Sequence, residues 1–302
     1  MKFVRYAGQS GTPALGLLRA DGARIAPLPA ALSADADLVD IIAAGPAALA
    51  AANAAAANAG GDIDLASVTL LAPLHAPRRN VFCVGKNYYA HAQEFHKSGF
   101  DAGSAGSAAI PDAPIVFTKA ATSISGPFDP IPGYLDETNS VDYEGELAVI
   151  IGKGGRGITK AEAMDHVFGF TVVNDVTARN LQASHKQWFL GKSIDGFCPM
   201  GPAVVTLDEI ESELGGVGAM RLRTWVDGEL RQDTQVSDLI FDIPTLIETI
   251  SKRITLQPGD VIATGTPEGV GIGFTPPKFL AGGEVVRVEI SGIGFIENTV
   301  EG

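Results

Sequence analysis

From about residue 77 onward, the hydrophobic positions form short runs that are separated by glycine and proline. This pattern is typical of strands joined by turns. Seven runs are candidate strands: 81–84, 115–118, 147–151, 168–173, 204–206, 261–264 and 285–290. A two-residue turn at Asp227–Gly228 predicts a β-hairpin. Isoleucine and leucine recur at helical spacing over 243–250 and predict one helix, so this part of the chain is expected to be β-rich.

The first 75 residues have a different pattern. Strand-like segments at 2–6 and 14–19 precede an alanine-rich stretch, 37–59, which predicts a helix that ends at Gly60–Gly61. This part of the sequence holds no cluster of side chains of the kind that bind ligands. We therefore divide the chain into a small N-terminal α/β domain, residues 1–75, and a β-rich domain, residues 76–302.

The composition predicts a folded protein and excludes several classes of partner. Of the 302 residues, 46% are hydrophobic and 19% are charged, which is enough apolar surface for a large core. A net charge of -13, with no long basic cluster, argues against binding to nucleic acid or to an anionic membrane. The two cysteines build neither a disulfide framework nor a zinc ribbon. With no secretion signal or bilayer-spanning segment, we expect a cytoplasmic protein.

A cluster of acidic residues is the first candidate for chemistry. The segment Asp142–Glu146 has carboxylates at alternate positions, which share one face of a strand. A solvated acidic strand is the common alternative, but the apolar run that follows indicates a central strand, where unpaired carboxylates are costly. Asp175 ends another apolar run, where it would either cap a helix or complete a three-carboxylate site with Glu144 and Glu146. Such hard oxygen ligands suit Mg²⁺, Mn²⁺ or Ca²⁺.

Three further features could act beside such a site. His91 and Glu94 share one face of a helix-like segment, as a general base and its orienting carboxylate do, although an exposed surface pair has the same spacing. Lys192 lies among aromatic residues and fits a semi-buried ammonium that stabilises an oxyanion, with a surface lysine as the alternative. The glycine-rich segment 264–271 would let backbone N–H groups and the Thr266 hydroxyl approach a small anion.

Five motifs, in their order along the chain, resemble those of the fumarylacetoacetate hydrolase family. They are Gly85–Tyr88 with His91 and Glu94, Asp142–Glu146, Asn174–Arg179 with Gln182, Gly191–Pro199, and Thr264–Gly271. The similarity covers roughly residues 77–302. It implies an α+β, β-rich fold, namely the family's mixed β-sandwich roll with a small N-terminal domain. It also implies a lid over about 88–113 and a homodimer with one Mg²⁺ or Mn²⁺ ion. Within that lid, the glycine, alanine and serine content of residues 98–113 predicts a mobile loop.

The resemblance also assigns roles to individual residues. It implies that the metal ligands are Glu144, Glu146 and Asp175. It implies that the catalytic groups are His91, Glu94 and Lys192, with the histidine and glutamate matching the lid pair of the acylpyruvate hydrolase and oxaloacetate decarboxylase branch. It implies that the substrate is bound by Tyr88, Arg179, Gln182 and Thr266.

Our hypothesis from the sequence is hydrolytic cleavage of a carbon–carbon bond in a 2,4-dioxo acid of the acylpyruvate or fumarylpyruvate type, which gives pyruvate and a carboxylic acid. His91 would deprotonate a water that attacks the 4-carbonyl, and the metal and Lys192 would stabilise the pyruvate enolate. Two alternatives use the same core: oxaloacetate decarboxylation, and keto–enol and double-bond isomerisation of a dicarboxylic dienoate of the 2-hydroxyhepta-2,4-diene-1,7-dioate type. A non-catalytic, metal-dependent binding protein would not need the His91–Glu94 pair.

Overall fold

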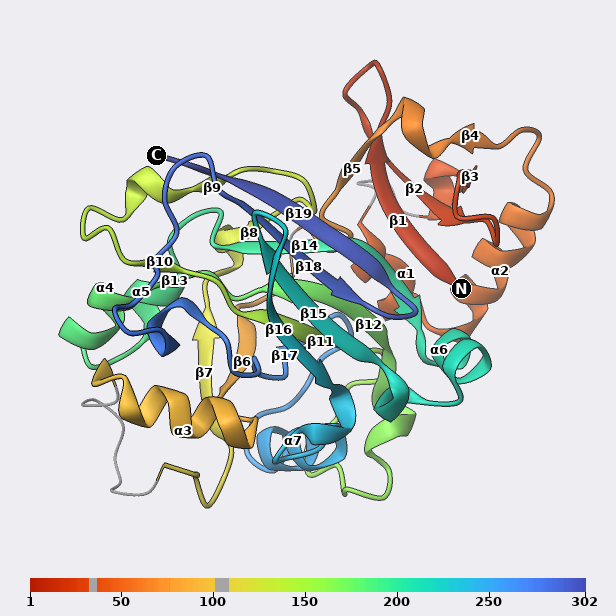
Figure 1. Ribbon diagram of the computed structural model, residues 1–302. Helices are drawn as coiled ribbons and strands as arrows, with labels where there is room; N and C mark the ends of the chain where they lie inside the picture. The colour runs from red at the N-terminus through yellow and green to blue at the C-terminus, as the bar shows by residue number, and fades with distance from the viewer. Residues whose placement is uncertain (33–36, 76, 101–108) are drawn as a thin grey trace.

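Two β-sheets form the body of the molecule. The computed structural model describes residues 1–32, 37–75, 77–100 and 109–302 (Figure 1). In these ranges the larger sheet consists of β1 (Lys2–Ala7), β2 (Pro13–Leu18), β3 (Arg24–Pro27), β4 (Ile63–Asp64), β5 (Thr69–Leu71), β6 (Val81–Gly85), β7 (Ile115–Lys119), β8 (Ile124–Ser125), β11 (Gly145–Ile151), β12 (Val167–Asn174), β14 (Cys198–Thr206) and β17 (Val261–Ala263). The smaller sheet consists of β9 (Ile131–Pro132), β15 (Arg221–Val226), β16 (Glu229–Gln235), β18 (Val285–Ile290) and β19 (Gly294–Glu301). Two short strands, β10 (Val141–Asp142) and β13 (Thr177–Ala178), pair with each other.

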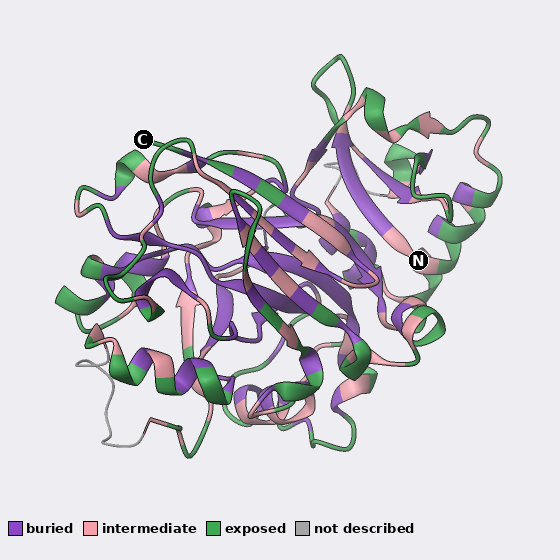
Figure 2. Ribbon diagram, viewed as in Figure 1, coloured by how far each residue is buried: buried purple, intermediate pink, exposed green. Residues whose placement is uncertain are grey.

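Helices lie around the edges of the sheets. They are α1 (Leu38–Ala44), α2 (Pro46–Ala57), α3 (Tyr89–Lys97), α4 (Arg179–Ser184), α5 (Phe189–Lys192), α6 (Leu207–Leu214) and α7 (Ile243–Ser251). Figure 2 shows buried residues along the central strands and exposed residues mainly on the helices and loops. In the described ranges, the helices are all too short or too polar to cross a bilayer.

Strand β11 lies at the centre of the larger sheet. It pairs antiparallel with β12 on one side and with β17 on the other, and all of its residues are buried. The smaller sheet packs over one face of this region through β15 and β18. On the other face, Ala148 and Ile150 belong to a hydrophobic cluster that includes Ile41, so both faces of β11 are covered. This arrangement confirms the α+β, β-rich class, and it confirms the prediction that the acidic segment leads into a central strand.

The N-terminal strands extend the larger sheet, because β1 pairs with β14 in the register Lys2↔Val205 and Phe3↔Val204. The helix predicted over residues 37–59 is present but broken at Gly45, whose φ is 78°, and Pro46 begins the second half. Its predicted end at Gly60–Gly61 is wrong, because the N–H of Asn58 bonds back to the helix carbonyls and caps it there. The domain boundary at residue 75 stays a prediction.

The other local predictions agree with the structure. The seven predicted strands are present as β6, β7, β11, β12, β14, β17 and β18. The hairpin turns at Asp227–Gly228, where both residues have positive φ. Helix α7 begins where predicted, with Asp242 accepting a hydrogen bond from the N–H of Thr245.

Strand β19 was not predicted. Its buried positions alternate, but one of them is Asn298, which interrupts the hydrophobic pattern. The Asn298 amide donates to the carbonyl of Asp129 at 2.7 Å and to that of Pro127 at 3.3 Å. A buried polar residue is stable there because the fold supplies acceptors from a distant segment.

Gly145 allows the two sheets to approach each other directly beside the acidic segment. A methyl group at this position would lie 2.9 Å from the Val288 Cγ1 atom and would also meet the Thr224 hydroxyl. We expect Gly145→Ala to lower the free energy of unfolding by about 1–3 kcal/mol, since overpacking forces neighbouring strands apart. Gly8→Ala is the control, because a methyl there meets nothing within 4 Å. Equal urea midpoints for the two variants would contradict this explanation.

Candidate active site

Glu144, Glu146 and Asp175 come together where β11 begins and β12 ends. The two strands are antiparallel, with Gly145 opposite Asn174, so the residues flanking these positions meet at one edge. One carboxylate oxygen from each residue lies within 4.8 Å of the others, and all three residues are buried. The structure therefore brings together the three acids that the sequence placed in one site.

Asp142 does not join them, although the alternation had placed it on the same face. The chain leaves strand geometry between β10 and β11, and the Asp142 carboxylate turns toward other partners. It pairs with Arg179 Nε at 2.8 Å and accepts from the backbone N–H of Gly271 at 2.6 Å. The predicted shared face is wrong for Asp142, which instead anchors the arginine.

Three buried cations compensate the acids. Lys192 Nζ lies 2.6 Å from a Glu144 oxygen and 2.9 Å from an Asp175 oxygen. Arg179 Nη1 lies 2.6 Å from the second Glu144 oxygen. Lys119 Nζ lies 2.7 Å from the second Asp175 oxygen and donates to the carbonyls of Val176 and Lys192. The surface-lysine alternative for Lys192 is therefore wrong.

Burial and charge move the pKa values of the two glutamates in opposite directions. Burial alone would raise the pKa of Glu144, but the charges of Lys192 and Arg179 outweigh it and lower that pKa to about 2. Burial raises the pKa of Glu146 well above its usual value, and the negative charges of Asp175 and Glu144 raise it further. A divalent cation would relieve this repulsion, so the donor set fits Mg²⁺ or Mn²⁺.

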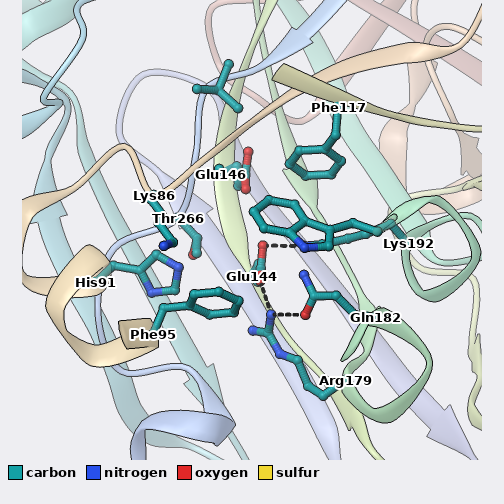
Figure 3. Close-up of a pocket in the computed structure, with 13 residues that line it drawn as sticks. Lys86, His91, Phe95, Phe117, Glu144, Glu146, Arg179, Gln182, Lys192 and Thr266 are labelled. Atoms are coloured by element: carbon teal, nitrogen blue, oxygen red, sulfur yellow. Dashed lines mark hydrogen bonds and ion pairs between the residues drawn. The ribbon is translucent and has the colours of Figure 1, made fainter. Parts of the chain in front are cut away.

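A narrow cavity of about 20 Å³ adjoins the acids (Figure 3), which is space for about one water molecule. Aromatic side chains form part of its wall: Phe95, Phe117 and Trp188. Its polar lining consists of Lys86, His91, Glu144, Glu146, Arg179, Gln182, Lys192 and Thr266. Sequence reasoning assigned no role to Lys86 or to Lys119. Lys119 pairs with Asp175 but is not among the residues that line the cavity.

His91 is buried and lines the cavity, so the interpretation as an exposed surface pair is wrong. Its Nδ1 atom lies 3.2 Å from the Glu94 carboxylate. Glu94 in turn accepts from the backbone N–H of Gly269 at 3.0 Å, which ties helix α3 to the glycine-rich segment. This chain of contacts fixes the imidazole and leaves Nε2 as the ring nitrogen that can exchange a proton with a substrate.

Of the four residues predicted to bind substrate, three line the cavity and Tyr88 does not. Arg179 is buried, and its Nη2 has no hydrogen-bond partner among the described residues. Gln182 accepts from Arg179 Nη1 at 3.2 Å, and the Thr266 hydroxyl accepts from Gln232 at 2.8 Å. Tyr88 is buried but is not among the residues that line the cavity, so its role in substrate binding stays a prediction.

Residues 80–301 match the family described as "Fumarylacetoacetate (FAA) hydrolase C-terminal". The chain belongs to the fumarylacetoacetate hydrolase family.

Two curated relatives are similar over most of the chain. Oxaloacetate tautomerase YisK of Bacillus subtilis (strain 168) is 49% identical over 236 residues, which cover 78% of this chain and 74% of that protein. The mitochondrial oxaloacetate tautomerase fahd2 of Xenopus laevis is 40% identical over 304 residues, which cover 99% and 90%. Both similarities extend well beyond a single motif.

A solved structure supports the fold. Maleylpyruvate hydrolase from Sphingobium sp. SYK-6, in complex with manganese (II) ion and pyruvate, aligns with a TM-score of 0.78 and 31% identity over 100% of this chain and 99% of that one. The predicted family and fold are thus confirmed, and the protein is an enzyme of a metal-dependent family. The homodimer, the cytoplasmic location and the lid over 88–113 stay predictions, and residues 101–108 of that lid lie outside the described ranges.

The raised pKa of Glu146 predicts that metal binding is linked to proton release. Without a bound cation, Glu146 holds its proton to higher pH than an ordinary glutamate, and a metal ligand must lose it. The apparent affinity for Mg²⁺ or Mn²⁺ should therefore rise with pH through this elevated pKa and fall as the pH is lowered. Titration calorimetry in two buffers of different ionisation enthalpy measures the protons released.

Glu146→Gln should weaken binding and remove this linked proton, because the amide does not titrate in this range. Glu137→Gln, at an exposed position, should leave both quantities unchanged. Identical observed enthalpies for the wild type in the two buffers would rule out the linkage.

Proposed function

We propose that the protein catalyses keto–enol tautomerisation of oxaloacetate, or of a 2-oxo dicarboxylate of similar size, with Mg²⁺ or Mn²⁺ as cofactor. The observation that carries this proposal is a buried imidazole, held by Glu94, on the wall of a narrow cavity beside three acids. Tautomerisation requires one group that moves a proton and a second that stabilises negative charge on oxygen. The names of two similar proteins, both oxaloacetate tautomerases, support the same reaction.

Arg179 is the residue best suited to hold a substrate carboxylate. Its Nε and Nη1 atoms are fixed by Asp142 and Glu144, so the guanidinium has a set orientation. Its Nη2 is buried without a partner among the described residues, and Gln182 lies beside it at the cavity. A carboxylate that accepts from Nη2 would satisfy this donor and place the substrate at the acids.

His91 would transfer the proton. Nε2 would take a proton from C3 of the substrate and deliver it to the 2-oxo oxygen, so that the keto form becomes the enol and no water is consumed. Glu94 would stabilise the ring while it carries this proton. The Lys192 ammonium, with a pKa that burial lowers but Asp175 and Glu144 raise above its usual value, would stay charged beside the developing oxyanion.

A divalent cation held by Glu144, Glu146 and Asp175 would polarise the 2-oxo group and so make the C3 proton more acidic. The three acids and Lys192 are buried, which strengthens each of these electrostatic contacts.

The hydrolase hypothesis remains the second candidate. The manganese- and pyruvate-bound maleylpyruvate hydrolase, a similar structure, favours it. Hydrolysis of an acylpyruvate also needs an attacking water and room for the acyl group beyond the 4-carbonyl. That room would have to be found beside the cavity wall formed by Phe95, Phe117 and Trp188.

We expect the purified protein, with Mg²⁺ or Mn²⁺, to accelerate the decay of the ultraviolet absorbance of enol-oxaloacetate. His91→Gln should lower kcat/KM at least about 100-fold, since it removes the proton carrier. Glu94→Gln should lower it less, because the imidazole loses only its orienting charge. The exposed His185→Gln serves as a matched control and should retain full activity.

The same preparation should be assayed for pyruvate release from oxaloacetate, acetylpyruvate and fumarylpyruvate. Metal-dependent cleavage of the dioxo acids, without acceleration of enol decay, would replace the tautomerase proposal with the hydrolase. Pyruvate release from oxaloacetate alone would identify a decarboxylase.

A further inference from the structure

Gln232 is a buried polar residue that lies behind the wall of the cavity. It belongs to β16 in the smaller sheet, and only 1% of its surface is exposed. Its Oε1 accepts from the backbone N–H of Gly145 at 3.1 Å. Its Nε2 donates to the Thr266 hydroxyl and to the carbonyl of Pro267, both at 2.8 Å. One side chain therefore joins the acidic segment to the glycine-rich segment.

Two of these partners fix the orientation of the Gln232 amide. The N–H of Gly145 can only donate, so it must face the amide oxygen, and the carbonyl of Pro267 can only accept, so it must face the amide nitrogen. Turning the amide over would place donor against donor and acceptor against acceptor in a buried position, where unmade hydrogen bonds are costly. Nε2 is therefore the atom that faces Thr266.

This orientation decides the role of the Thr266 hydroxyl. The amide nitrogen can only donate, so Thr266 Oγ1 accepts this bond and its own proton must point elsewhere. In the described part of the chain, no atom accepts that proton. Thr266 is buried and lines the cavity, and Figure 3 shows it on the same side of the cavity as His91. A buried donor without an acceptor at a cavity indicates that a ligand supplies the acceptor.

We propose that Gln232 is a positioning residue, which holds Thr266 as an obligate hydrogen-bond donor to a substrate oxygen that carries no proton, such as a carboxylate or 2-oxo oxygen. The proposal rests on the function proposed above, in which the substrate is a 2-oxo acid. A donor that is already oriented needs no reorganisation when negative charge develops on the substrate. Without the Gln232 amide, the hydroxyl would be free to rotate away from the substrate.

A double-mutant cycle in the enol-decay assay tests whether Gln232 acts through Thr266. Thr266→Val should lower kcat/KM about 10- to 100-fold, since it removes a hydrogen bond to a charged group, and Thr266→Ser should recover most of that loss. Gln232→Met should lower kcat/KM about 10-fold. The double variant should be within about 2-fold of Thr266→Val, because the positioned hydroxyl is already absent. Losses that multiply would overturn the proposal. Gln257→Met, at an exposed position, is the matched control and should behave as the wild type.

Metal binding separates this role from an effect on the acids. Gly145 lies between Glu144 and Glu146, so loss of its bond to Gln232 could disturb both glutamates. If Gln232 acts through Thr266, Gln232→Met should change the Kd for Mn²⁺ less than about 3-fold in titration calorimetry. A loss of Mn²⁺ affinity as large as the loss of kcat/KM would overturn the proposal.

Binding of oxalate, an unreactive dianion, separates this proposal from the proposed function. With Mn²⁺ present, Thr266→Val and Gln232→Met should each bind oxalate about 5- to 10-fold more weakly, and the double variant no more weakly than Thr266→Val. Unchanged affinities would overturn the role of Gln232, and a wild type that does not bind oxalate would overturn both proposals. A wild type that binds oxalate but has no tautomerase activity would overturn only the proposed function.

The wild-type protein provides a test that does not depend on whether Gln232→Met folds. Neutron diffraction from crystals exchanged into D₂O should show the deuteron on Thr266 Oγ1 directed into the cavity, with both deuterons of the Gln232 amide directed at Thr266 and Pro267. A Thr266 deuteron directed at Gln232 would overturn the proposal.

Discussion

Compensation of buried negative charge is the constraint on which the rest of the site depends. Carboxylates in a protein interior are stable only when they are paired and hydrogen-bonded. Glu144 and Asp175 share Lys192, Glu144 also pairs with Arg179, and Asp175 also pairs with Lys119. Because these two acids share Lys192, loss of that lysine would leave each of them with a single cation. The elements that carry these residues are therefore held together by charge as well as by packing.

The two-sheet fold makes this network possible. Antiparallel pairing of β11 and β12 places the acids at one edge, and α4 and α5 bring the arginine and one lysine to the same edge. Gly145 lets the smaller sheet close over the acidic segment, so that water is excluded and each ion pair is strengthened. A rigid, dry centre of this kind suits any reaction that forms negative charge on a 2-oxo acid.

The pair that we propose to transfer protons is built on a different part of the structure. His91 and Glu94 lie on α3, which contacts the centre through the glycine-rich segment. Lys86 lies just before this helix, at the end of β6. The charged centre and the groups on α3 thus lie on separate elements, and similar proteins are named as tautomerases and as a hydrolase.

The sequence by itself determined the features that depend on local pattern. Short hydrophobic runs, turn residues and helical spacing located most strands, the hairpin and α7, and the ordered motifs brought out the three acids and the His91–Glu94 pair. Tertiary structure alone decided that the Asp142 carboxylate turns toward Arg179, that Lys119 pairs with Asp175, and that His91 is buried. Lys119 bonds to a carbonyl 73 residues away, and Asn298 is stable in β19 because of carbonyls about 170 residues away. Periodicity carries no information about such partners, since they are chosen by the packing of one sheet on the other.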